Sequence, residues 1–207
     1  MANPWLSISA SDYEGHMCDP SVGQYQMLNN FFKEVLERTN PESVVVFGSS
    51  AGNGFEHLIN RKTKLVKAID INPEYCEILK HRFSGMIRGL EVECSDISSV
   101  QTASNAYDLA HCALIFEYVD VEKLLVRIKN ALKPDGCMSV VLQQPCSEKD
   151  PVTKTSFKNL EKLRDLMHLI DSADFRELAI NEGFDVFSEK NIVLDTGKKF
   201  YSGIFKV

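Results

Sequence analysis

Five short apolar runs constrain the fold of this chain more than any other feature. They are rich in valine, isoleucine and leucine, and they span residues 43–47, 65–70, 90–94, 107–116 and 137–143. Runs of this length, separated by helical patterns or turns, are typical of strands that alternate with helices. This order predicts a parallel sheet with helices on both faces, because parallel neighbours need a long crossover connection.

The last two apolar runs depart from this alternation. They span about 184–194 and 199–206, and only the short turn "DTGK" separates them. A turn of that length cannot make a crossover, so the pair must form an antiparallel hairpin. We therefore expect an α/β fold with a doubly wound, seven-stranded, mostly parallel sheet and a C-terminal antiparallel hairpin. The chain is expected to be a single domain, with a Rossmann-like part at 41–207 and an N-terminal helical cap segment at 1–40.

Helix start signals divide the segments between the strands. Ser11 with Glu14, and Ser21 with Gln24, match the capping-box spacing at the start of two N-terminal helices. Further helices are expected at 53–61, from Pro73 behind its cap Asn72 to about Phe83, behind the cap Asp120, at 157–170 and at 172–182.

Composition and charge argue against several classes of protein. The chain has 207 residues, a size that fits one domain. Its net charge is −6, and because binding to phosphates would need a more basic surface, no nucleic acid partner is expected. The six cysteines form no C-x-x-C and the histidines no H-x-x-x-H, which predicts reduced core cysteines and no metal site. No stretch resembles a signal peptide or reaches the length of a membrane span, so we expect a cytoplasmic protein without a membrane partner.

A glycine-containing turn follows the first apolar run, within "VVVFGSSAGNG" at 44–54. A turn between a strand and a helix presents backbone amides to the ligand in many nucleotide-binding folds. The dinucleotide fingerprint G-x-G-x-x-G from Gly48 would need glycine at Ser50 and Asn53, so this turn does not match it. Gly52 and Gly54 would let backbone approach a ligand closely. The alternative is a bare helix-capping turn.

An acidic residue ends the second apolar run. Asp70 lies 22 residues beyond Gly48 (70 − 48 = 22), close to the spacing at which a carboxylate accepts ribose hydroxyls in nucleotide-binding folds. A nicotinamide cofactor would need the same acid, so Asp70 indicates a ribose and not one particular cofactor. The alternative is a solvent-side cap of the next helix, a role that Asn72 fills better.

These motifs resemble those of the class I S-adenosylmethionine (SAM)-dependent methyltransferases. "VVVFGSSAGNG", "AIDINPEY", "ECSDI", "YDLAHCALIFEYV" and "LKPDGCMSVVLQ" are similar, in order and spacing, to that family's motifs at strands one to five. Two positions depart from the family pattern: Val46 stands where an acid often orients the methionine end, and Ser50 stands at the second glycine. The resemblance implies SAM as cofactor and S-adenosylhomocysteine (SAH) as product, bound by Gly48, Ser49, Ser50, Gly52, Gly54, Asp70, Ile71, Asp96, Ile97 and His111.

The resemblance also implies how the adenine is held. Asp96 would accept a hydrogen bond from the adenine amino group, and Ile71 and Ile97 would pack on the ring faces. The alternative for Asp96 is a loop residue in an Asx-turn. His111, near the end of the fourth run, is either a base, a substrate contact or a packed structural histidine.

Two segments outside these motifs are candidates for the acceptor side. In "DYEGHM", Tyr13, Glu14 and His16 are proposed to face the methyl donor or acceptor, although Glu14 could serve the capping box alone. The segment 144–158 follows the fifth run without a core pattern, so it either lines the acceptor pocket or is a plain surface loop. The candidate catalytic residues are therefore His111, Tyr13 and His16.

The resulting functional hypothesis is transfer of a methyl group from SAM to a small-molecule acceptor. The fourth run carries "HCAL" where the nucleobase- and glutamine-methylating branch has N/D-P-P-Y/F, which argues against those substrates. Three rivals stand beside it: a catalytically idle SAM-fold binding protein, a nicotinamide-dependent oxidoreductase, and an aminopropyl transferase that uses decarboxylated SAM. The sequence leaves the acceptor and the oligomeric state open.

Overall fold

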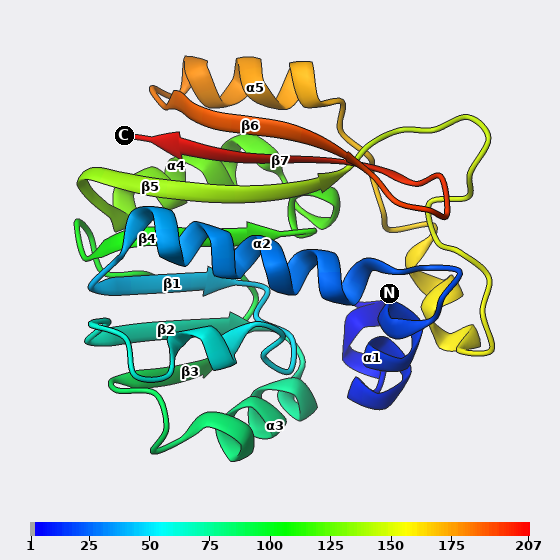
Figure 1. The fold of residues 1–207 in the computed structure, drawn as a ribbon, viewed down its shortest axis with the longest axis horizontal. Helices are drawn as coiled ribbons and strands as arrows, with labels where there is room; N and C mark the ends of the chain where they lie inside the picture. The colour runs from blue at the N-terminus through cyan, green and yellow to red at the C-terminus, as the bar shows by residue number, and fades with distance from the viewer. Residues whose placement is uncertain (1–2) are drawn as a thin grey trace.

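One seven-stranded sheet organises the computed structural model, which describes residues 3–207 (Figure 1). Its strands follow the order β3-β2-β1-β4-β5-β7-β6. β7 is antiparallel to both β5 and β6, and all the other pairs are parallel. The predicted fold class is therefore confirmed. The strands are β1 (Ser43–Phe47), β2 (Leu65–Asp70), β3 (Leu90–Cys94), β4 (Tyr107–Ala113), β5 (Leu132–Gln143), β6 (Asp185–Val193) and β7 (Lys199–Lys206).

Helices cover both faces of this sheet, with α2 in front of it and α4 behind it in Figure 1. The α-helices are α1 (Ala10–Cys18), α2 (Gln24–Thr39), α3 (Pro73–Phe83), α4 (Val121–Ala131) and α5 (Ser172–Asn181). Short 3₁₀-helices are η1 (Pro4–Ser7), η2 (Phe55–Leu58), η3 (Phe116–Tyr118) and η4 (Lys158–Leu163). Within residues 3–207, no helix combines the length and the apolar character needed to cross a membrane.

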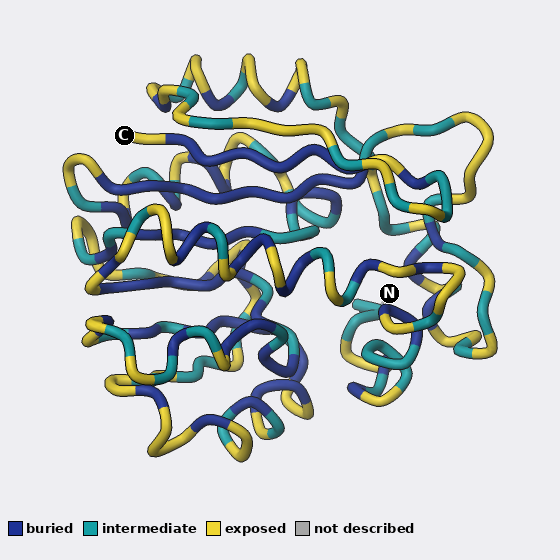
Figure 2. The backbone as a smooth tube through the Cα atoms, viewed as in Figure 1, coloured by how far each residue is buried: buried dark blue, intermediate teal, exposed yellow. Residues whose placement is uncertain are grey.

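The continuous apolar run of β1 follows from its place at the centre of the sheet. Val44 and Val46 point into a core that includes residues of α2, whereas Val45 and Phe47 point into a core that includes residues of α4. All four side chains are buried, because successive residues of a strand face opposite sides and both sides are covered here. Figure 2 shows the central strands buried and the edge strand β6 largely exposed.

Two of the predicted helix caps are confirmed. Asn72 accepts hydrogen bonds from the backbone N–H groups of Glu74 and Tyr75, with Pro73 as the first residue of α3. Asp120 caps α4 in the same manner. Both side chains satisfy backbone donors that have no partner within the helix.

The predicted capping box of Ser11 and Glu14 is wrong. The N-cap of α1 is Ser9, whose hydroxyl accepts a hydrogen bond from the backbone N–H of Asp12. Ser9 and Asp12 have the same three-residue spacing, so the sequence holds two overlapping signals and the earlier one is used. Glu14 is left free to pair with Arg82 of α3.

The predicted capping box of Ser21 and Gln24 is also wrong. α2 begins at Gln24 behind Gly23, which adopts a left-handed conformation and provides no side-chain cap. The hydroxyl of Ser21 instead donates to the carboxylate of Asp19 at 2.6 Å. A local side-chain bond of this kind competes with capping.

Two predicted helices are much shorter than expected. The segment 53–61 contains only the 3₁₀-helix η2, and the segment 157–170 contains only the 3₁₀-helix η4. Neither has a side-chain hydrogen bond at its N-cap. Without such a cap, helices this short are marginal, and packing decides their form.

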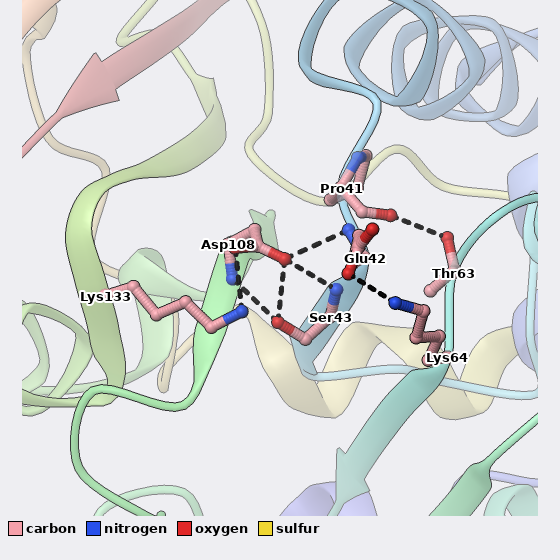
Figure 3. Close-up of polar contacts among 7 residues, drawn as sticks. All are labelled: Pro41, Glu42, Ser43, Thr63, Lys64, Asp108 and Lys133. Carbon is pink, nitrogen blue, oxygen red and sulfur yellow. Dashed lines mark hydrogen bonds and ion pairs between the residues drawn. The ribbon is translucent and has the colours of Figure 1, made fainter.

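The carboxylate of Asp108 joins the amino ends of β1 and β4 (Figure 3). One oxygen of Asp108 accepts hydrogen bonds from the backbone N–H groups of Glu42 and Ser43, at 2.9 and 2.8 Å, and its other oxygen contacts Lys133 at 2.8 Å. Burial opposes ionisation, but the bonds from Lys133 and Ser43 outweigh it and hold the pKa of Asp108 below its usual value. Asp108 is thus a structural tie at this edge.

Candidate functional site

Three neighbouring cavities lie around the carboxyl ends of the strands, where open α/β sheets bind ligands. We call them the first, second and third cavity; they enclose about 690, 560 and 460 Å³ of space, including some open to solvent. These volumes fall in the usual range of small-molecule sites, roughly 300–1,000 Å³. Tyr13 of α1 lines all three.

The structure brings most of the predicted cofactor residues to the first two cavities. Gly52 and Gly54 line neither of them. A β-carbon at Gly52 would meet Phe83 of α3, and one at Gly54 would meet Phe32 of α2, so these glycines allow helices to pack against the turn. The first cavity is lined by Gly48, Ser50, Asp70, Ile71, Asp96 and Ile97, and the second by Gly48, Ser49, Ser50 and His111.

Asp70 is the buried acid of the first cavity, with 8% of its surface exposed. It accepts hydrogen bonds from the backbone N–H groups of Ser50, at 2.8 Å, and Asn72, at 2.9 Å. Burial raises the pKa of Asp70, although these hydrogen bonds oppose the rise. A carboxylate has about four acceptor positions, so the backbone bonds leave room for hydroxyl groups of a ligand in the cavity.

Position 48 favours a residue without a side chain. Its φ is +75°, and a β-carbon there would lie 2.9 Å from the side chain of Ile115. Ile115 lines the same cavity. A side chain at this position would therefore strain the backbone and displace Ile115 in the cavity wall.

The structure shows Asp96 in an Asx-turn at the border of the first cavity, and its contact with an adenine stays a prediction. One carboxylate oxygen accepts a hydrogen bond from the backbone N–H of Ser98 at 2.8 Å, as in an Asx-turn. The residue also lines the first cavity together with Ile71 and Ile97. The Asx-turn thus fixes the position of the carboxyl group without using all of its acceptor positions.

His111 has the surroundings of a packed histidine at the border of the second cavity. Its Nδ1 lies 2.8 Å from the hydroxyl of Ser139, and its ring stacks on Phe32 with centroids 4.2 Å apart. Burial lowers the pKa of His111 to about 3. The ring is therefore neutral at pH 7 and a poor proton acceptor, which favours a positioning role.

The N-terminal segment is tied over the first cavity by α3. The side chain of Asn72 donates hydrogen bonds to the backbone carbonyls of Trp5 and Ile8, each at 2.9 Å, and Glu74 accepts one from the backbone N–H of Ala10 at 3.0 Å. Trp5 and Tyr13 line the cavity on that side. The sequence motifs identified Asn72 as a helix cap but gave no sign of this second role.

The third cavity lies under the segment that follows β5. Pro151 and Val152 of the predicted acceptor segment line it, together with His16 and Lys198. Nδ1 of His16 lies 3.0 Å from the hydroxyl of Thr155. The segment 144–158 thus takes part in the cavity, and His16 faces it. Lys198, by contrast, was absent from the predicted site residues.

Tyr118 lines both the first and the third cavity, whereas its neighbour Glu117 lines neither. Glu117 is fully buried. One of its oxygens accepts a hydrogen bond from the backbone N–H of Gln143 at 2.8 Å, and the other has no partner within residues 3–207. Burial raises the pKa of Glu117 to about 7.

This pKa predicts a specific pH dependence of stability. Between the ordinary value of 4.5 and about 7, the folded protein binds more protons than the unfolded chain, so the free energy of unfolding falls as pH rises. Glu117→Gln removes this fall. Denaturant titrations should show the variant gaining about 2–3 kcal/mol relative to the wild type from about pH 5 to about pH 8.

The control for this prediction is Glu122→Gln, which removes the same charge from an exposed position of α4. The free energy of unfolding of this variant, plotted against pH, should run parallel to that of the wild type. Parallel curves for Glu117→Gln as well would contradict a raised pKa at Glu117.

Comparisons with known proteins relate the chain to others at the level of family and fold. A family model described as a methyltransferase domain matches residues 45–140. Over 136 residues, the chain is 21% identical to an uncharacterised methyltransferase-like protein of Schizosaccharomyces pombe, covering 66% of this chain and 50% of that protein. The chain thus spans about half the length of the curated relative it matches.

Solved structures share the fold at low sequence identity. The [4+2]-cyclase SpnF has a TM-score of 0.69 and 13% identity, covering 86% of this chain and 80% of that one. The N-methyltransferase NodS of Bradyrhizobium japonicum, solved with SAH, has a TM-score of 0.66 and 15% identity, covering 88% and 86%. Identity this low supports the fold and leaves the reaction and the acceptor to the residues of the site.

Proposed function

We propose that this chain is a methyltransferase of the class I, SAM-dependent type, with SAM as the methyl donor, because the family model of a methyltransferase domain matches residues 45–140. We propose that SAM lies across the first and second cavities and that its methyl group passes to a small molecule in the third. The observation that carries this proposal is the position of Tyr13, which borders all three cavities. A donor and an acceptor in these cavities would meet beside that ring.

The residues present fit an adenosine with a methionine end. Asp70 has acceptor positions left for the two ribose hydroxyls, and Ile71 and Ile97 offer apolar surfaces to the adenine. Ser49, which lines the second cavity, has a buried hydroxyl without a hydrogen-bond partner within residues 3–207. A buried polar atom of this kind is unfavourable until a partner arrives.

Glu14 supplies the acid that the glycine turn lacks. Val46, at the position where the family often has an acid, lines the second cavity with an apolar side chain, and Glu14 of α1 lines the same cavity. Arg82 holds the Glu14 carboxylate at 2.9 Å and also donates to the backbone carbonyl of Ala51 at 3.1 Å. We assign Glu14 to the ammonium group of the methionine end.

Methyl transfer requires mainly that the donor and the acceptor are aligned. When bound, SAM would supply an electrophilic methyl group. The bond from the acceptor atom to this carbon would form as the S–CH₃ bond breaks, and sulfur would keep the electron pair. The products would be the methylated acceptor and SAH, and the acceptor proton would go to solvent. Trp5, Tyr13 and Tyr118 exclude water and orient the two reactants, which lowers the entropic cost of the transfer. No catalytic base is required if the acceptor atom carries a free electron pair.

Incubation with methyl-labelled SAM and the low-molecular-weight fraction of a cell extract tests this function. We expect label to move into small molecules as SAH accumulates, and Asp70→Asn to lose both signals. Binding of SAM without SAH formation would identify an idle binding protein, and label confined to macromolecules would contradict a small-molecule acceptor. Tighter binding of NAD(H) than of SAM would favour the oxidoreductase.

A further inference from the structure

The third cavity has a wall that the two cofactor cavities do not share. We call it the far wall, and its residues come from the end of β5, the segment after it, the 3₁₀-helix η4 and the turn before β7. Trp5, Tyr13 and Tyr118, in contrast, border the first cavity as well. A molecule in the third cavity would therefore have one end toward the cofactor and the other against the far wall. The far wall comprises Gln143, Pro151, Val152, Leu160, Leu163 and Lys198.

One cation lies in this mostly apolar wall. Lys198 has only 4% of its surface exposed, and its ammonium group donates one hydrogen bond, to the backbone carbonyl of Pro151 at 2.8 Å. An ammonium group has three donors, so two are left without a partner within residues 3–207. Burial lowers the pKa of Lys198 to about 8, which still leaves the charged form in the majority at pH 7.

No direct ion pair within the described part of the chain neutralises this charge, although Asp150 nearby raises the pKa of Lys198 against the effect of burial. Within residues 3–207, Lys198 forms no ion pair, and no aspartate or glutamate lines the cavity. The nearby carboxylate of Asp150 is already paired with Arg164 at 2.7 Å. Burial and the charge of Lys198 both lower the pKa of His16, so that ring is neutral. A buried cation without a counter-ion is unfavourable, and an anionic ligand would relieve the cost.

We propose that the acceptor is a small organic acid, with an apolar or aromatic body and one carboxylate that Lys198 binds at the far wall. This inference rests on the proposed methyltransferase function. The carboxylate is an anchor; the atom that receives the methyl group lies at the other end of the molecule, beside Tyr13 and Tyr118. Lys198 is thus a specificity-determining residue that takes no part in the transfer.

The test compares acids with their uncharged analogues on the SAH-loaded protein. Calorimetric titrations use benzoate with benzamide, 3-phenylpropanoate with 3-phenylpropanamide, and hexanoate with hexanamide as pairs of equal shape. We expect at least one carboxylate to bind about tenfold or more tightly than its amide, because hydrogen bonds to a charged partner are roughly twice as strong. This comparison needs no variant that could fail to fold.

Variants then assign the preference to Lys198. Lys198→Met should abolish it, Lys198→Arg should keep it, and Lys199→Met, at the exposed neighbouring position, should leave it unchanged. A preference that survives Lys198→Met, or no preference in any pair while SAH binds, overturns the anionic acceptor and leaves the proposed methyltransferase standing. If SAH itself does not bind, the proposed methyltransferase function is contradicted, and the inference about the acceptor falls with it.

Discussion

Replacing Asp70 with asparagine should weaken SAM binding by about 100-fold. Two charge-assisted hydrogen bonds to the ribose would be lost or weakened, and hydrogen bonds to charged groups contribute about 1.5–3 kcal/mol each. The amide nitrogen of asparagine would also face the backbone N–H of Ser50 or of Asn72, which now donate to the two oxygens. Calorimetric titration with SAM measures the loss.

Asp108→Asn is the matched control for this prediction. Asp108 also accepts backbone hydrogen bonds, from Glu42 and Ser43, but at the amino ends of the strands (Figure 3). This variant should lose stability in denaturant titrations and keep its affinity for SAM. If both variants lost stability but kept their affinity for SAM, Asp70 would have a purely structural role, as Asp108 has.

Gly48→Ala should lower SAM affinity by tenfold or more. The left-handed conformation at this position costs a residue with a β-carbon about 1–2 kcal/mol. The added carbon would also displace Ile115, its neighbour at 2.9 Å, in the wall of the first cavity. Both the affinity and the free energy of unfolding should therefore fall.

Gly23→Ala separates these two effects. Gly23 has a φ of +65°, and a β-carbon there would meet nothing within 4 Å. This variant should lose a similar amount of stability from backbone strain and retain its affinity for SAM. Equal losses of affinity in both variants would show that strain alone, and not the shape of the cavity, weakens binding.

The sheet and its connection to the helices were predictable from the sequence. A central strand buried on both faces is largely apolar, and residues 44–47 are apolar throughout. Asn72 and Asp120 precede their helices with the side chains that backbone donors require. These features depend on neighbours in the sequence, which is why local patterns reveal them.

The contacts that build the site depend instead on residues far apart in the chain. Ser9 and Ser11 each precede an acidic residue by three positions, yet only Ser9 caps α1. Asn72 reaches the backbone of Trp5, 67 residues away. Lys198 and Lys199 are adjacent and chemically identical, yet only Lys198 is buried in a cavity. No local sequence pattern shows which serine caps the helix, which distant backbone Asn72 contacts, or which of the two lysines is buried.

A crystal structure of the protein with SAH tests the central claim most directly. The account predicts the ribose hydroxyls within hydrogen-bonding distance of the Asp70 carboxylate, the adenine between Ile71 and Ile97, and the sulfur turned toward Tyr13. SAH bound at any other place, or a first cavity that stays closed by side chains at saturating SAH, would contradict it.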